Sequence, residues 1–139
     1  MAAGNHDAIK NVARKNANLL LDQFSPLEEV IKRIQVYKSE LNKNKLNNDT
    51  RNRVALARAL HIAKDEKKMD VIEKRMMARS KVDQLSERPY SKYQSSIMSF
   101  KGPDEALNGA LIGTEEEIHE RLKKLRDNEI GYLLLVDAG

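Results

Sequence analysis

RVALARALHIAKD, from Arg53 to Asp65, is the stretch that decides the fold class. Large residues at Val54, Leu56 and Leu60 alternate with alanines, which predicts a β-strand. The absence of Gly and Pro favours a position inside a sheet. The larger side suits cover by a helix, and the alanine side suits tight packing. Arg58 interrupts the larger side, so we expect it to need a partner, either a carboxylate within the barrel or one at a dimer interface.

Two short apolar runs predict further strands. They are Leu19–Leu21 and Tyr132–Val136, and their unbroken apolar character is typical of strands buried on both faces of a parallel sheet. Ala2–Gly4 is expected to be the tail of one more strand. Between the strands, apolar residues recur three or four positions apart, which predicts helices. The expected helices span about 5–17, 26–41, 65–85 and 114–128.

Two of these helices begin with the pattern of a capping box. In this motif a hydroxyl and a glutamate three residues later satisfy free N–H groups of the first turn. The patterns are Ser25–Glu28, where Pro26 suits the first helical position, and Thr114–Glu117. We therefore expect Ser25 and Thr114 to cap their helices.

Residues 86–113 are expected to form a long loop, with a short helical turn after Pro103. Long ordered loops in compact domains are often functional. This one carries four large apolar or aromatic residues that are candidates for a lid, the alternative being local packing. They are Tyr90, Tyr93, Met98 and Phe100.

Alternation of strands and helices predicts parallel strands joined by right-handed crossovers. A complete (β/α)8 TIM barrel has eight strands and about 250 residues. The 139 residues supply three clear strands. The expected fold class is therefore α/β, a partial TIM barrel that forms a single segment over residues 1–139.

Composition excludes several classes of protein. The chain has no cysteine, which removes disulfide frameworks and thiolate chemistry. No apolar run approaches the length of a membrane span, and the N-terminus lacks the apolar core of a signal peptide, so a cytoplasmic protein is expected. Residues 1–64 carry 12 Lys/Arg and 6 Asp/Glu, a charge of +6, whereas residues 65–139 carry 13 and 15, a charge of −2. Nucleic acid is not the expected partner, because aromatic residues make up only 4% of the chain.

Four stretches in this order resemble the bacterial-luciferase-like, flavin-dependent monooxygenases. They are Ala2–Asn5 before a helix, Ala17–Phe24 as a strand, Arg53–Asp65 as the next strand, and Gly113–Leu135 as the last helix and strand. The resemblance covers nearly the whole chain but only the C-terminal half of the family's barrel. It implies FMN as cofactor, with reduced flavin, O2 and a small organic substrate as partners, and with a flavin reductase as a possible further partner.

The resemblance also implies cofactor-binding residues. Gly4, Asn5 and His6 match the turn that touches the FMN phosphate, and helix N-termini do favour anions. The alternative is a simple helix cap at Asn5, and Asp7 would repel an anion unless it points away. Asp22 and Gln23 match the strand end that faces the flavin, the alternative being a plain turn.

Two histidines remain to be placed. His61, near a strand end, is a weak candidate for a catalytic base, although such residues are more often simply hydrogen-bonded. His119 is expected on an exposed helix face with no role. The three histidines lie far apart in sequence, so no metal site is expected.

Three functions from different classes remain open. The leading one is the C-terminal portion of an FMN-dependent monooxygenase, inactive as an isolated fragment. The alternative is a non-catalytic half barrel that binds a partner or associates with itself as a homodimer, because open sheet edges favour pairing. Basic charge alone supports the third, nucleic-acid binding.

Overall fold

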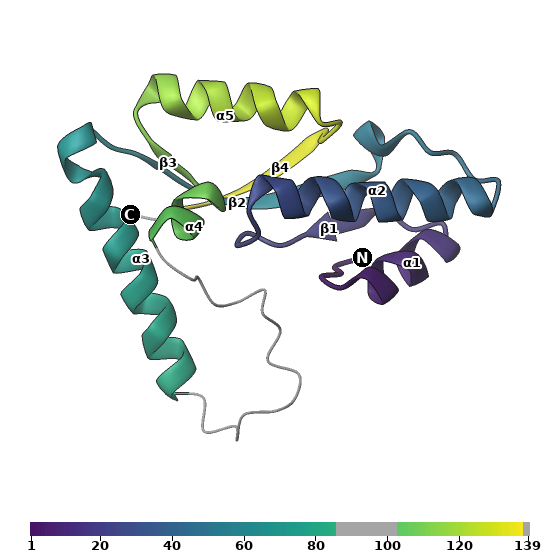
Figure 1. Ribbon diagram of the computed structural model, residues 1–139, viewed down its shortest axis with the longest axis horizontal. Coiled ribbons are helices and arrows are strands. Elements are labelled where there is room, and N and C mark those ends of the chain that lie inside the picture. The colour runs from purple at the N-terminus through teal and green to yellow at the C-terminus, as the bar shows by residue number, and fades with distance from the viewer. Residues whose placement is uncertain (86–102, 138–139) are drawn as a thin grey trace.

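The computed structural model describes residues 1–85 and 103–137, in which helices and strands alternate (Figure 1). The helices are α1 (His6–Arg14), α2 (Leu27–Lys43), α3 (Asp65–Leu85), α4 (Pro103–Asn108) and α5 (Glu115–Asp127), with a short 3-10 helix at Thr50–Asn52. The strands are β1 (Leu19–Leu21), β2 (Val54–Ile62), β3 (Leu111–Gly113) and β4 (Tyr132–Asp137).

Strand β2 lies at the centre of the sheet. Its Leu56 has Cα partners in both β1 and β4, and its Leu60 has partners in both β3 and β4. Strand β4 therefore runs along one edge of β2, while β1 and β3 share the other edge. All three pairings are parallel, as the sequence predicts. Beyond β1, Ala2 adds an isolated parallel bridge to Leu20.

Side chains on the two faces of β2 enter two separate hydrophobic cores, because neighbouring residues of a strand point to opposite faces. Leu60 packs against the larger core and Ala59 belongs to the smaller one. The larger core joins the sheet to α1, α2 and α5, and the smaller one joins it to α3 and α4. Figure 1 shows α3 extending away from the sheet at the end opposite to α1.

Two helix starts behave as the sequence predicts. The Asn5 side chain accepts a hydrogen bond from the N–H of Ala8 at 2.8 Å. Thr114 and Glu117 form a complete capping box, each side chain bonding the other residue's backbone N–H. These caps fix where α1 and α5 begin.

The expected cap at Ser25 is wrong. Helix α2 begins one residue later, with Pro26 at the N-cap and no side-chain cap. The Ser25 hydroxyl instead donates to the Asp22 carboxylate and accepts from Arg33. Hydrogen bonds to charged groups are stronger than those to neutral main-chain groups. The Ser25 hydroxyl therefore bonds Asp22 and Arg33 instead of an N–H group in the first turn of α2.

The loop expected over residues 86–113 is also shorter than the sequence indicates. The short helical turn expected after Pro103 is confirmed as α4 (Pro103–Asn108), whereas Leu111–Gly113, expected within the loop, is the strand β3. Only three residues long, β3 is too brief for a periodicity to reveal. The proposed lid residues and the rest of 86–102 lie outside the described residues.

Strand β4 forms where expected, but its side chains are not buried. Tyr132 is 56% exposed, Leu134 50% and Val136 43%. The prediction assumed a sheet covered on both faces, and in the described residues nothing covers this part of β4. No helix in residues 1–85 and 103–137 is both long and apolar enough to cross a bilayer.

An ion pair and a close approach hold the turn between α5 and β4. Lys38 on α2 donates to the Glu129 carboxylate at 2.9 Å, and the Thr50 hydroxyl donates to the same carboxylate at 2.6 Å. Next to this turn, a Cβ placed on Gly131 would lie 1.8 Å from the carbonyl oxygen of Arg51. Only glycine fits there.

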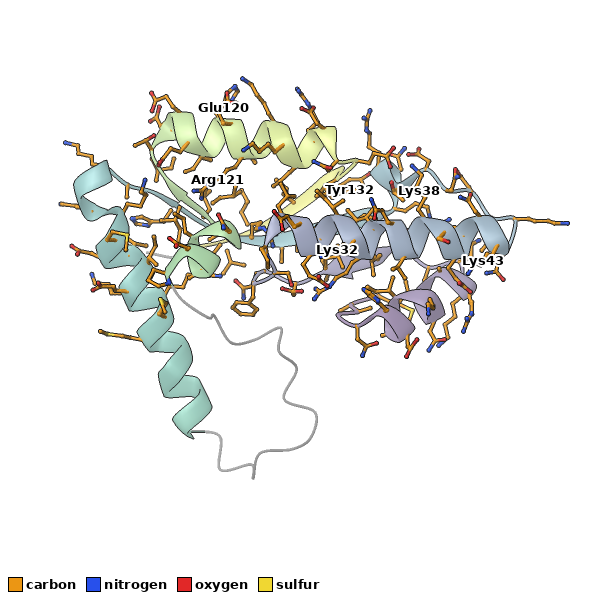
Figure 2. The ribbon with its side chains drawn as sticks, in the orientation of Figure 1. Lys32, Lys38, Lys43, Glu120, Arg121 and Tyr132 are labelled. Carbon is orange, nitrogen blue, oxygen red and sulfur yellow. The ribbon has the colours of Figure 1, made fainter. Side chains whose placement is uncertain are left out.

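Helix α5 also holds the segment that leads from α4 into β3. One nitrogen of Arg121 donates to the carbonyls of Leu107, Ala110 and Ile112, at 3.1–3.3 Å. Figure 2 shows Arg121 on the side of α5 that faces α4 and β3, and Glu120 on the outer side. A single side chain thus satisfies three carbonyls of an otherwise irregular segment.

Replacing Gly131 by alanine should destabilise the fold, because the added methyl collides with main chain that a side-chain rotation cannot move. We expect Gly131→Ala to lower the free energy of unfolding by about 2 kcal/mol, measured by urea denaturation. Ser39→Ala on the exposed face of α2 is the control, with a change within about 0.5 kcal/mol. Equal stability of the two variants would contradict the close approach.

Candidate functional site at the carboxyl ends of the strands

Parallel strands end at one edge of their sheet, and the residues that follow them gather there. Ala2, Leu20 and Ala55 lie side by side, since Ala2 bridges Leu20 and Leu20 is in register with Ala55. Gly4 and Asp22 each come two residues later. The structure therefore brings the turn after the first strand segment close to the turn after β1.

His61 is not part of this group. It lies four residues beyond the level of Gly4 and Asp22 on β2, roughly 13 Å along the strand. Its Cα partner is Ile112 of β3, and its side chain is half-buried. His119 is exposed on α5, as expected.

The start of α1 offers main-chain donors rather than side chains. The Asn5 side chain is already occupied as the cap. Asp7 is 93% exposed and lies 3.5 Å from the Lys10 amine, one turn along the helix. His6 is exposed. An anion here would meet the free N–H groups of the first turn and the positive end of the helix dipole.

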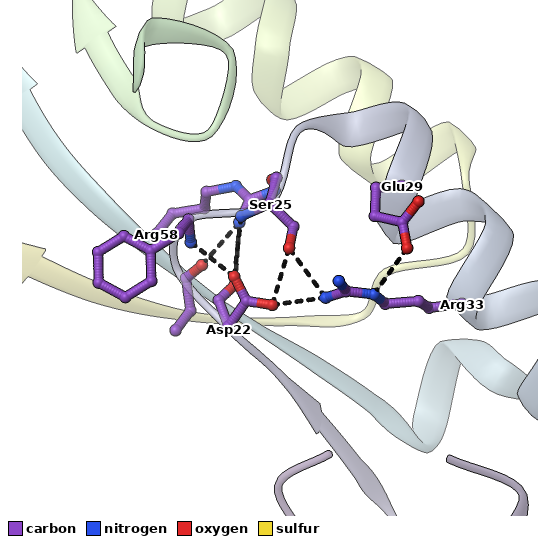
Figure 3. A network of polar contacts seen from close by, with 7 residues as sticks. Asp22, Ser25, Glu29, Arg33 and Arg58 are labelled. Carbon is purple, nitrogen blue, oxygen red and sulfur yellow. Dashed lines mark hydrogen bonds and ion pairs between the residues drawn. The ribbon is translucent and has the colours of Figure 1, made fainter. Parts of the chain in front are cut away.

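Asp22 is the centre of a network of polar contacts at the end of β1 (Figure 3). One carboxylate oxygen accepts from the N–H groups of Phe24 and Ser25, at 2.7 and 2.8 Å. The other accepts from the Ser25 hydroxyl at 2.9 Å and from Arg33 at 2.6 Å. Arg33 is itself buried and also donates to Glu29 at 3.1 Å. Both oxygens of Asp22 are thus engaged within the chain.

Burial and hydrogen bonding act on Asp22 in opposite directions. Burial alone would raise the pKa of the carboxyl. The N–H groups of Phe24 and Ser25, the Ser25 hydroxyl and the charge of Arg33 outweigh it, so the pKa lies below its ordinary value. Asp22 is therefore ionised at neutral pH and serves to fix the turn.

Arg58, in β2, stabilises the same turn. It donates to the carbonyl of Asp22 at 3.0 Å, to that of Ser25 at 2.7 Å and to that of its neighbour Ala57 at 3.1 Å. Burial lowers the pKa of Arg58 to about 10, although the negative charge of Asp22 opposes the shift. The prediction that Arg58 is hydrogen-bonded to a carboxylate is therefore wrong. The hydrogen bonds of Arg58 go to main-chain carbonyls. The carboxylate of Asp22 acts on Arg58 through its negative charge, without a side-chain hydrogen bond to it.

Arg33 and Arg75, which complete the site, are not among the residues predicted from the sequence. Arg75 on α3 donates to the carbonyl of Gln23 at 3.2 Å and lies over the Phe24 ring, 5.5 Å from its centre. Burial lowers the pKa of Arg75. Arg33 sits on the buried stripe of α2, and a charged residue on an apolar stripe is a signal that sequence reasoning can detect. Arg75 follows no such pattern.

A hollow of about 190 Å³ lies at the other end of the strands. Residues at the start of β1, β2 and β4 line it, together with Met1. Leu20, Ala55, Tyr132 and Leu134 line one wall. Functional groups of parallel barrels lie at the carboxyl ends, so this hollow is not the expected active site.

Comparison with solved structures places the chain among parallel barrels. It resembles monooxygenase RslO1 from Streptomyces bottropensis with a TM-score of 0.62 and 15% identity, over 98% of this chain and 40% of that one. A Baeyer–Villiger monooxygenase, the oxygenating constituent of 3,6-diketocamphane monooxygenase from Pseudomonas putida, solved with FMN, gives 0.62 and 16%, over 98% and 41%.

An F420-dependent secondary alcohol dehydrogenase, solved with an F420–acetone adduct, gives a TM-score of 0.63 and 12% identity, over 99% of this chain and 42% of that one. No protein-family model and no curated protein matches the sequence. Identities this low show a shared fold alone. The fold is a partial TIM barrel, and the chain spans about two fifths of the length of the structures it matches.

Removing Arg58 should leave the carbonyls of Asp22 and Ser25 buried without a donor. We expect Arg58→Ala to lower the free energy of unfolding by about 3 kcal/mol, measured by urea denaturation. Arg126→Ala, whose side chain is 71% exposed, should change it by less than about 0.5 kcal/mol. A loss below about 1 kcal/mol for Arg58→Ala would mean that the turn does not depend on this guanidinium.

Asp22 should make the stability depend on pH. Since its folded-state pKa lies below the unfolded value, its contribution is present above about pH 4 and is lost as the pH falls through the lower folded-state pKa. We expect Asp22→Asn to cost about 2 kcal/mol at pH 7. This difference from the unsubstituted chain should shrink progressively below pH 4.

Urea denaturation at pH 7, 5, 4 and 3 measures this difference. Asp127→Asn, with a side chain 65% exposed, serves as the control and should stay within about 0.5 kcal/mol of the unsubstituted chain throughout. A cost of Asp22→Asn that is the same at pH 7 and pH 3 would contradict the assignment.

Proposed function

We propose that this chain supplies the C-terminal β/α units of a luciferase-like, FMN-dependent monooxygenase. One observation carries the proposal: almost the whole chain superposes on two monooxygenases, one of them solved with FMN. The order of its parallel strands and the position of its polar residues agree with a barrel whose chemistry occurs at the carboxyl ends.

The start of α1 fits the phosphate group of FMN. Free N–H groups of the first turn and the helix dipole favour an anion there. Asn5 holds the turn in place through its bond to the Ala8 N–H. Asp7 is directed along the helix toward Lys10 rather than across the N-terminus, which reduces its repulsion of an anion. Gly4 and His6 belong to the same turn.

These residues provide only part of a binding site for the flavin ring. Asp22 is fully engaged with Ser25 and Arg33, so it positions the turn that carries Gln23 and is not free to bind. The hollow described above lies at the opposite end of the strands, away from this turn. The isolated chain is therefore expected to be inactive, and the rest of the ring site would come from further strands.

When bound and reduced, FMN supplies the oxygen chemistry: it reacts with O2, and a small organic substrate is oxidised. A flavin reductase would deliver the reduced flavin. The residues of this chain would bind the phosphate, fix the turn after β1 through Asp22 and Arg58, and present Gln23 toward the ring. His61 lies too far along β2 to join the phosphate turn, and its role as a base remains a prediction.

The first test is turnover by the isolated chain with FMN, NADH, O2 and a flavin reductase. We expect oxygen consumption and NADH oxidation no greater than those of the reductase alone, because the ring site is incomplete. Substrate oxidation above that background would refute the inactivity of the isolated chain.

The phosphate site has a test that does not need activity. Asp7→Asn removes a negative charge near the start of α1, so FMN should bind about two- to fivefold more tightly, as judged by quenching of flavin fluorescence. Asp127→Asn on the distant helix α5 is the matched control and should leave FMN binding unchanged. Riboflavin, which lacks the phosphate, should not respond to Asp7→Asn. Equal responses of FMN and riboflavin would argue against a phosphate site at α1.

A further inference from the structure

Helix α3 carries three methionines whose side chains differ in exposure. Met69 is 46% exposed and Met77 is 61% exposed, whereas Met76 is partly buried and packs against the smaller hydrophobic core. Met76 lies four residues beyond the fully buried Ile72, and residues at this spacing share one side of a helix. Met76 is therefore in contact with both solvent and a core.

The smaller core has few large side chains in the described part of the chain. Three of its six buried members there are alanines, Ala59, Ala106 and Ala110. Apolar burial stabilises a core in proportion to the area that it removes from water, so alanines contribute little. The attachment of α3 therefore depends strongly on each larger side chain, including the long and flexible one of Met76.

Arg75, which precedes Met76, connects α3 to the turn after β1. Its guanidinium donates to the carbonyl of Gln23 at 3.2 Å and lies over the ring of Phe24, 5.5 Å from the centre. Arg75 and Met76 belong to the same turn of one helix, so they move together. A loss of packing at Met76 therefore also withdraws Arg75 from the turn that follows β1.

We propose that Met76 is an oxidation site that controls the attachment of α3 to this turn. The oxidant is hydrogen peroxide, which transfers one oxygen atom to the sulfur. An S–O bond forms, the O–O bond breaks, the sulfur loses two electrons, and the other oxygen leaves as water. The product, methionine sulfoxide, is polar. Against a core of apolar side chains its oxygen lacks a hydrogen-bond donor, and burial of such a group is unfavourable.

Oxidation then favours a state in which α3 has left Ala59 and Ile112 of the smaller core. The start of the helix is held separately, because the Lys68 amine lies 2.6 Å from the Glu117 carboxylate. The larger core stays folded, since no described residue of α3 belongs to it. Methionine sulfoxide reductases reverse the reaction, so the attachment of α3 can be restored. The inference does not depend on flavin binding.

Peroxide treatment of the isotope-labelled chain tests the proposal. Peptide mapping by mass spectrometry should show the gain of one oxygen at Met76. The amide signals of Gln23 and Phe24 in the NMR spectrum should shift, and that of Tyr37 in the larger core should not. Methionine sulfoxide reductases with dithiothreitol should restore the original spectrum. The thiol has no other target, because the chain contains no cysteine.

Variants separate Met76 from the two exposed methionines. Met76→Leu keeps a similar apolar volume and should fold, but peroxide should no longer shift Gln23 and Phe24. Met69→Leu combined with Met77→Leu is the matched control and should leave the response to peroxide unchanged. Met76→Gln introduces a polar group at the same position and should shift the same two signals without peroxide.

Four results would each overturn the proposal. Met76 stays unoxidised while Met69 and Met77 are fully converted. Its oxidation leaves the signals of Gln23 and Phe24 in place. The response survives Met76→Leu. Signals of the larger core shift together with that of Gln23, which would mean that the whole chain unfolds.

Discussion

The parallel pairing of β2 on both of its edges is the constraint on which the structure depends. Every named strand of the sheet forms its ladder with β2, and no other pair of them is in register. Its alternate side chains pack into both hydrophobic cores, Leu60 on one face and Ala59 on the other. Arg58, in the same strand, fixes the turn after β1 through two carbonyls. Fold and candidate site thus share one element.

That element is also the one that the sequence reveals best. Nine residues of alternating size allow little besides a strand, and a complete capping box at Thr114 leaves little doubt where α5 begins. The capping pattern misleads where other polar side chains compete for the same hydroxyl. Ser25 has the pattern of a cap, yet its hydroxyl bonds Asp22 and Arg33 instead. The capping motif includes neither of these residues.

The candidate site, like the fold, could be predicted from the sequence only in part. Its position at the strand ends follows from the order of the elements, and Asp22 and Gln23 lie there as expected. What the sequence does not give is the role of Asp22. Four hydrogen bonds, from two main-chain N–H groups, the Ser25 hydroxyl and the Arg33 guanidinium, make this carboxylate part of the scaffold. The exposure of β4 could not be predicted from the sequence either, because an apolar run does not show which elements cover it.

The presence of two cores rather than one has a consequence for how the chain opens. Among the described residues, the smaller core joins α3 and α4 to Ala59 of β2 and Ile112 of β3, so it can separate while the larger core stays intact. Backbone amides near Val71 and Ile72 would then exchange their hydrogens sooner than those near Leu56 and Leu41. The C-terminal end of β2, which packs against α3 and α4 through Ala59, is therefore the part of the sheet that local unfolding reaches first.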